Sequence, residues 1–215
     1  MQPIKSVENE NYVLEVYRDE LVETPREWDN LGTMITYHNH YILGEKELNG
    51  GYPSMYDEFK EEVIYGDLGL EVDDDGLADC IMEDEVVYFP LFLFDHSGLR
   101  MDYTPFSCRW DSGQVGYIYV THEKVKEHFN IDKVDGEHIK KAKDILKAEV
   151  KTMDSYLSGD IYYICLKEKK TCKCCEYTSM EVIESIGGFY GYDGIKEGIK
   201  EYLPKDTHSL ADMLD

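Results

Sequence analysis

Cysteines form the most reactive group of residues in this sequence. The group comprises Cys165, Cys172, Cys174 and Cys175. If a hairpin turns at 168–169, the first two of these cysteines face each other and the third shares their face, so three thiolates converge. Tetrahedral zinc prefers four ligands from paired Cys or Cys/His spacings, which this sequence lacks. We therefore interpret them as reduced cysteines and expect no metal or other cofactor, with Cys165, Cys172 and Cys174 as the alternative metal ligands.

A histidine with polar neighbours follows the longest apolar run of the chain. Asp95, His96 and Ser97 come at its end, where strands commonly present functional groups, and histidine can act as a general acid or base. Arg100 and Arg109 are the only arginines of the central region for holding a phosphate. No Gly-x-Ser-x-Gly elbow accompanies them, and the sequence specifies no catalytic residue. These five residues define an alternative pocket, for a small enzyme or binding protein that degrades or sequesters a signalling nucleotide.

A glycine-rich segment from Gly187 to Gly194 precedes a predicted helix and superficially resembles a phosphate cradle. It lacks the Gly-Lys-Ser/Thr ending of a P-loop, and Asp193 would repel phosphate. We interpret the segment as a tight turn stabilised by aromatic packing.

An acidic run imitates the start of a calcium-binding loop. Glu71, Asp73 and Asp75 occupy positions 1, 3 and 5 of an EF-hand pattern, and Gly76 follows at position 6. Position 12 is Met82, where that pattern requires a bidentate glutamate. The run is therefore interpreted as a solvated acidic loop or as an acidic interaction surface.

Acidic residues dominate the whole chain and concentrate in one part of it. The 215 residues hold 22 Lys+Arg and 45 Asp+Glu, a net charge of −23. Residues 57–87 contain thirteen acids and one lysine, a net −12, whereas residues 121–215 carry only −4. Nucleic-acid binding depends on clustered Lys and Arg, so we expect no direct binding of nucleic acid.

Hydrophobic periodicity predicts the elements that must position these residues. Strands are expected at 12–17, 86–94 and 114–120, a short helix after Ser54, a long amphipathic helix over about 136–157, and a hairpin of 161–166 with 171–177. Pro90 places the second strand at an edge or a bulge, and the tail after Pro204 is expected to be frayed. The pattern predicts an α+β fold: a mainly antiparallel sheet with a long amphipathic helix and several short helices.

Length and composition predict a single domain over 1–215 with an acid-rich insert at about 66–86. The N-terminus has no cationic and apolar leader, and the longest apolar run is far shorter than a membrane-spanning helix. We expect a cytoplasmic protein with free thiols and no contact with a membrane.

Several longer motifs resemble an uncharacterised protein family encoded by tailed phages and prophages. They are residues 25–34 (PREWDNLGTM), 95–98 (DHSG), 104–120 (TPFSCRWDSGQVGYIYV), 156–160 (YLSGD) and 187–192 (GGFYGY). The acid-rich insert and the cysteine cluster depart from that pattern. The resemblance implies a phage accessory protein acting in the host cytoplasm, and such proteins often block host defence.

These observations lead to one main hypothesis. The chain is expected to be an acidic inhibitor of anti-CRISPR or anti-restriction type, which binds the basic groove of a host nuclease or defence complex and imitates nucleic acid. The expected contact residues are the acids of the insert and, second, Trp28 and Asp29. The insert acids are Glu71, Asp73, Asp74, Asp75, Asp79, Glu83, Asp84 and Glu85.

Overall fold

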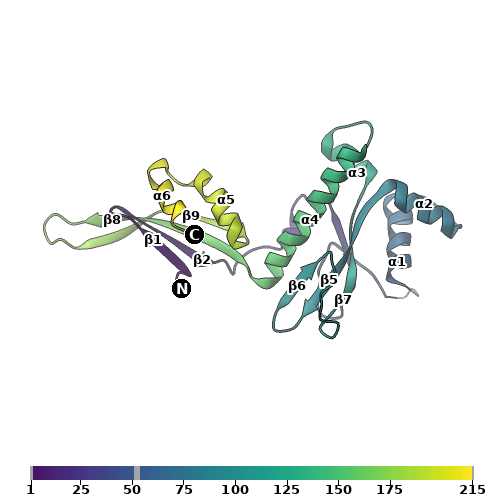
Figure 1. The fold of residues 1–215 in the computed structure, drawn as a ribbon, viewed down its shortest axis with the longest axis horizontal. Coiled ribbons are helices and arrows are strands. Elements are labelled where there is room, and N and C mark those ends of the chain that lie inside the picture. The colour runs from purple at the N-terminus through teal and green to yellow at the C-terminus, as the bar shows by residue number, and fades with distance from the viewer. Residues whose placement is uncertain (1, 51–53, 215) are drawn as a thin grey trace. The chain divides into compact units, whose positions relative to one another are not determined.

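The computed structural model describes residues 2–50 and 54–214, which divide into two compact units (Figure 1). One unit combines Met1–Glu23 with Ser155–Asp215, and the other consists of Thr24–Asp154. The sequence predicts a single domain for 1–215, whereas the contacts in the structure group the residues into these two units. The acid-rich insert lies inside the second unit.

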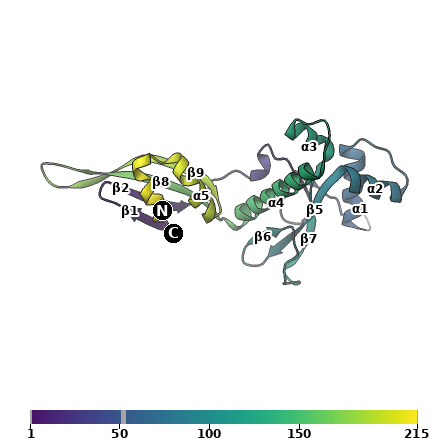
Figure 2. The same cartoon turned by 45° about the horizontal axis from the view of Figure 1, so that its top comes forward.

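The first unit is a four-stranded antiparallel sheet with helices on one face (Figures 1 and 2). Its strands are β1 (Lys5–Glu8), β2 (Tyr12–Arg18), β8 (Ile161–Thr171) and β9 (Thr178–Tyr190), in the order β1-β2-β8-β9. Helices α5 (Tyr192–Tyr202) and α6 (His208–Asp212) follow, with a 3-10 turn (Lys205–Thr207) between them.

Alternating apolar residues join this sheet to its helices. Leu14 and Val16 in β2 are fully buried against Ile195 and Ile199, which are spaced i, i+4 on α5. Burial of each such side chain contributes about 1.5 to 3 kcal/mol. Leu214 is also fully buried, so the expectation of a frayed tail after Pro204 was wrong: the chain end packs into this core.

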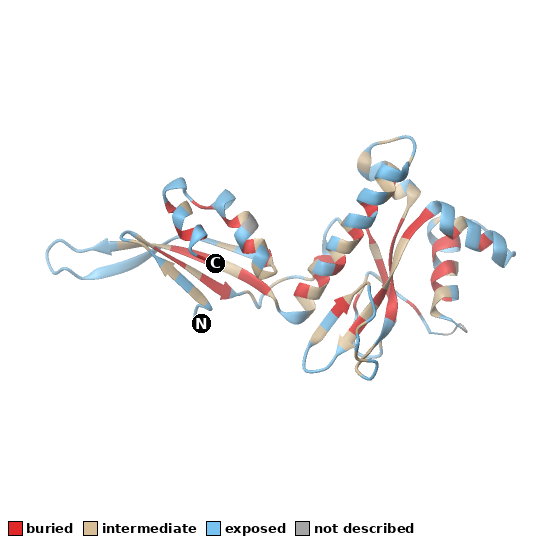
Figure 3. Ribbon diagram, in the orientation of Figure 1, coloured by how far each residue is buried: buried red, intermediate tan, exposed pale blue. Residues whose placement is uncertain are grey.

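The β8–β9 hairpin turns later than the sequence predicts. The expected turn at 167–170 lies inside β8, and the chain reverses over 172–177 instead. The reason is cross-strand charge pairing: Lys167 bonds Glu15 at 2.5 Å and Lys169 bonds Glu8 at 2.7 Å. The charged run is therefore the polar face of a strand. Pairing of β8 with β2 ends at Glu168, and the part of the hairpin past that point, residues 170–185, is exposed (Figure 3).

The second unit is a five-stranded sheet between helices. Its strands are β3 (Thr33–Thr36), β4 (Lys46–Glu47), β5 (Val86–Asp95), β6 (Leu99–Asp102) and β7 (Ser112–Thr121), in the order β4-β3-β7-β5-β6. Its helices are α1 (Met55–Glu61), a π-helical turn (Glu62–Asp67), α2 (Asp75–Glu85), α3 (His122–Phe129) and α4 (Gly136–Ser158), the last of which continues into the first unit at Ser155. The β3–β4 pair is parallel and the others are antiparallel.

Alternation along β7 separates the two faces of this sheet. Tyr117 and Tyr119 pack with Phe59 of α1. Ile118 points the other way and lies beside Leu146 of α4. Helices α1 and α4 thus cover opposite faces, as Figures 1 and 2 show.

These features confirm the α+β prediction. The two sheets are mainly antiparallel, and the long amphipathic helix expected near 136–157 is α4. Pro90 lies beside a register shift in β5 and before the residues that pair with β6, as expected for an edge or bulge position. In the described part of the chain, no helix is long and apolar enough to cross a membrane.

Candidate functional site

The acid-rich insert contains a helix where the sequence predicts a loop. Asp74 caps α2 by accepting the Leu77 N–H at 2.9 Å. Ala78 and Met82, spaced i, i+4, are buried in the core around Phe59. The loop interpretation holds for residues 71–74 but was wrong from Asp75 onward, because the high acid content concealed a cap and an apolar stripe of helical period.

This helix also removes the resemblance to a calcium-binding loop. Asp75 is the first residue of α2, and Asp74 is engaged in its cap. An EF-hand loop over 71–82 would need residues 74–82 in the irregular conformation of that loop and not in a helix. Residues 71–82 therefore do not form such a loop.

All eight predicted contact acids of the insert are exposed. Asp75, Asp79 and Glu83 succeed one another at i, i+4 and i+8, so they follow one face of α2 at a rise of about 6 Å per step. Glu71 and Asp73 precede the helix, and the rest of the set lies on α2 or at its cap. The structure thus gathers the predicted acids on α2 and on the four residues before it.

One lysine lies among these acids, and it is nearly buried. Lys60 of α1 is 8% exposed; its ammonium lies 2.9 Å from Asp79 and 3.7 Å from Asp75. The hydrogen bond from Lys60 to Asp79 raises the lysine pKa despite burial. Residues 61–99 contain neither Lys nor Arg. The surface of α2 is consequently acidic beyond this internal pair.

The charge density of α2 is close to that of a nucleic-acid strand. Its 11 residues rise about 16 Å and carry five acids, or about one acidic charge per 3 Å and, with the paired Lys60 counted, about one net charge per 4 Å. One strand of B-DNA carries one charge per about 3.4 Å of axis. A cationic groove spaced for phosphates would therefore meet a similar density of negative charge.

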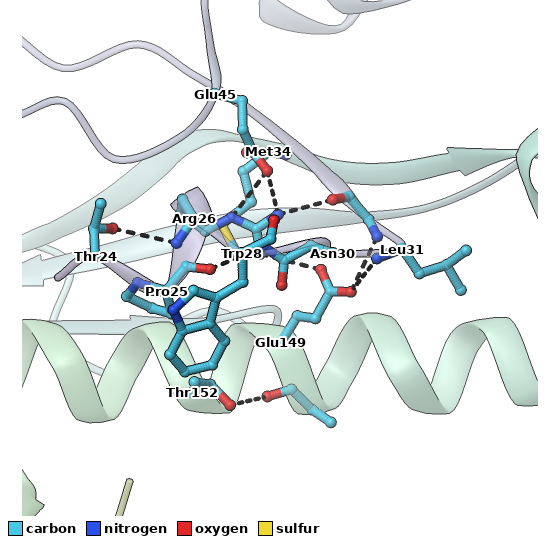
Figure 4. A network of polar contacts seen from close by, with 12 residues as sticks. Thr24, Pro25, Arg26, Trp28, Asn30, Leu31, Met34, Glu45, Glu149 and Thr152 are labelled. Carbon is cyan, nitrogen blue, oxygen red and sulfur yellow. Dashed lines mark hydrogen bonds and ion pairs between the residues drawn. The ribbon is translucent and has the colours of Figure 1, made fainter. Parts of the chain in front are cut away.

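Trp28 and Asp29, the second candidate pair, belong to a different surface. Trp28 is 49% exposed and precedes the residues, Leu31 and Gly32, that bond to α4 (Figure 4). Because α2 packs with α1 on the other face of the sheet, the structure does not combine this pair with the insert acids.

The motif around Trp28 is organised by a buried arginine that sequence reasoning missed (Figure 4). Arg26 is 8% exposed and bonds Glu45 and, at 3.1 Å, Glu149 of α4. Glu149 also accepts the N–H groups of Leu31 and Gly32. The network ties residues 26–32 to α4, which gives this motif a structural role.

The alternative pocket residues are not assembled around one cavity. Asp95, His96 and Ser97 lie at the β5–β6 turn, where Ser97 has φ +59° and the His96 N–H bonds the Gly98 carbonyl at 3.3 Å. Arg100 forms two 2.8 Å bonds to Asp154.

A cavity of about 380 Å³ lies nearby, between the β5 and β7 ends. Asp95, Asp111 and Trp110 help to line it, whereas His96, Ser97, Arg100 and Arg109 are outside its lining. The pair that comes closest to a catalytic proton relay is His96 and Asp111, whose Nδ1 and Oδ1 atoms are 3.7 Å apart. Neither arginine of the set lines this cavity for phosphate binding.

The glycine-rich segment 187–194 forms the end of β9 and the start of α5. Gly191 is the N-cap, with φ +75°, and Asp193 lies in the first helical turn. The carboxylate of Asp160 is also beside Gly191. Two carboxylates at this helix start disfavour an anion. The interpretation as a turn was wrong for residues 187–190, which lie in β9, where Phe189 and Tyr190 pair with β8.

The structure separates Cys165 from the other candidate metal ligands. Cys165 is buried in β8 opposite Ser185, so the predicted pairing with Cys172 was wrong because the turn lies farther along the chain. Cys172, Cys174 and Cys175 share that turn. Hydrogen bonds from Cys174, and then from Cys175, lower the pKa of Cys172 to about 6.

Comparisons with protein-family models, curated proteins and solved structures find no match to this chain.

Proposed function

We propose that the chain is an acidic inhibitor, carried by phage, of a nucleic-acid-binding protein of host defence. It binds its target stoichiometrically and presents α2 with residues 71–74 to the groove that the target uses for DNA or RNA. The proposal rests on one observation: exposed acids on α2 reach the charge density of a nucleic-acid strand, within a stretch, 61–99, that has no Lys or Arg.

Rigid presentation supports this proposal. Met82 is fully buried and Asp74 caps the helix, so the carboxylates are held on a folded element. A preorganised surface loses less conformational entropy on binding than a loop does. Charge-assisted bonds from arginine or lysine to such carboxylates are the strongest class of hydrogen bond at an interface.

Long-range attraction supports it as well. Opposite charges steer association, and screening weakens them once salt shortens the Debye length from about 10 Å at 0.1 M to 3 Å at 1 M. A protein of net charge −23 with a local −12 over 57–87 is suited to such steering.

A displacement assay tests the proposal. Host proteins retained on immobilised duplex DNA are challenged with the purified chain at low and high salt, and the released proteins are identified. We expect a discrete protein to be released at low salt and to elute in a complex with the chain. Release of no protein, or release unchanged at high salt, would overturn the proposal.

Two matched variants assign the effect to α2. E71Q/D73N/E83Q/D84N removes four exposed acids that, among the described residues, make no hydrogen bond or ion pair. E10Q/E20Q/E184Q/E201Q removes four exposed acids from the first unit. Each variant removes four negative charges, so only the first should lose displacement if α2 is the contact surface.

A further inference from the structure

The turn of the β8–β9 hairpin gathers three sulfurs. The Sγ atoms of Cys172, Cys174 and Cys175 all lie within 4.8 Å of one another, and the first two are 2.9 Å apart. Metal–sulfur bonds of about 2.3 Å place ligating sulfurs roughly 3.8 to 4.0 Å apart at tetrahedral or trigonal angles. The 2.9 Å spacing is shorter than this value and no spacing exceeds 4.8 Å, so side-chain rotation in the turn has to move the first two sulfurs about 1 Å apart.

The turn backbone is held by its own hydrogen bonds. The Cys172 N–H donates to the Tyr177 carbonyl at 2.8 Å, and the Glu176 N–H donates to the Cys172 carbonyl at 2.9 Å. Glu176 takes a left-handed conformation, φ +56°, that closes the loop. These bonds hold the three cysteines in one turn.

The local charge is much less acidic than that of α2. Residues 167–182 contain four lysines and three glutamates, in a chain whose net charge is −23. Three of the lysines, Lys167, Lys169 and Lys170, pair with glutamates of this unit. A cluster of anionic sulfurs therefore costs less Coulomb energy here than it would near α2.

The hairpin end has few other contacts to stabilise it. Beyond Glu168, β8 has β9 as its partner but no longer β2, and the side chains at 171–185 are exposed (Figure 3). A two-stranded ribbon is marginal in water without a further constraint. A metal bound across the turn would supply one.

We propose that Cys172, Cys174 and Cys175 form a site for one soft d10 cation, Zn²⁺ or Cu(I), bound by three thiolates. Each thiol that ligates releases its proton to solvent. Cu(I) is satisfied by three sulfurs. Zn²⁺ takes a water as fourth ligand, because no other His, Cys, Asp or Glu of the described residues joins the cluster.

Titration of the reduced, full-length chain tests the site. Zn²⁺ and Cu(I) are added in separate arms against a chromophoric chelator, and Cd²⁺ is added to record thiolate-to-metal charge-transfer absorption. We expect one ion per chain, an absorption change that saturates at one equivalent, and slower amide hydrogen exchange in residues 167–182. The arm with the tighter binding identifies the preferred ion.

Serine variants provide the control. C172S/C174S/C175S, in an exposed turn, should lose binding and the charge-transfer band, whereas C80S/C108S should retain both. A single ligand substitution should weaken binding by more than the roughly 10- to 100-fold that an outer partner costs. The site is refuted if the reduced chain binds no ion, or if the triple variant binds as the wild type does.

Discussion

Substitution of Glu149 by alanine should destabilise the second unit strongly. The variant removes the 3.1 Å ion pair to Arg26 and leaves the N–H groups of Leu31 and Gly32 without their carboxylate acceptor. The Arg26 side chain is buried, at 5% exposure, and the Glu149 side chain is nearly so, at 11%. Breaking such a pair costs about 3 to 5 kcal/mol, and the remaining Glu45 contact places the expected loss near 3 kcal/mol.

Urea denaturation followed by circular dichroism measures this loss. With a slope of about 1 to 3 kcal/mol per molar urea, the midpoint should fall by roughly 1 to 3 M. E149Q keeps an acceptor and should lose less. E137A removes an exposed i, i+4 pair with Lys141 on the same helix and should lose about 0.3 to 0.5 kcal/mol. A loss in E149A no larger than in E137A would refute the structural role assigned to this network.

Three further predictions concern packing and pH. G116A places a Cβ 2.0 Å from a β3 carbonyl and should cost at least about 2 kcal/mol in a thermal melt, whereas G113A, with no atom within 4 Å, should not. M82A should cost about 2 to 5 kcal/mol and speed hydrogen exchange in α2; unchanged exchange would contradict the buried anchor. Burial raises the pKa of Glu15, but bonds from Lys167 and a tyrosine hydroxyl outweigh it and lower the pKa overall. Its stabilisation is complete above the ordinary glutamate pKa and is lost as pH falls through the lowered value, so E15Q should flatten the acid limb of stability against pH; an unchanged limb would contradict this.

Long periodic elements were predictable from the sequence. The stripe through Ala142, Leu146 and Val150 identifies α4 nearly to its ends, because one buried face repeats at helical spacing over six turns. Gly159, at φ +66°, follows it in the left-handed conformation that commonly ends a helix. Local pattern suffices where a single face is buried throughout.

Elements whose environment is set by distant residues were not predictable. The Lys167 to Lys170 run reads as a turn until its partners on β1 and β2 are known. In α2, acids are as numerous as the apolar residues, and the two buried positions matter only because the core around Phe59 receives them. The candidate acids were found from charge alone, whereas their helical arrangement required the structure.

The Arg26 network left one trace in the sequence. Glu149 follows Leu146 by three residues and so lies toward the buried side of α4, where an unpaired carboxylate would be costly. That position signals a cationic partner, but the sequence does not identify which one.

An equilibrium competition tests the central claim most directly. The protein released in the displacement assay is titrated with the chain in the presence of increasing duplex DNA, at several salt concentrations. We predict that DNA and the chain exclude each other, that affinity falls as salt rises, and that E71Q/D73N/E83Q/D84N lowers both affinity and salt slope while E10Q/E20Q/E184Q/E201Q leaves them near wild type. Simultaneous binding of DNA and the chain, or equal loss in the two variants, would contradict imitation of nucleic acid by α2.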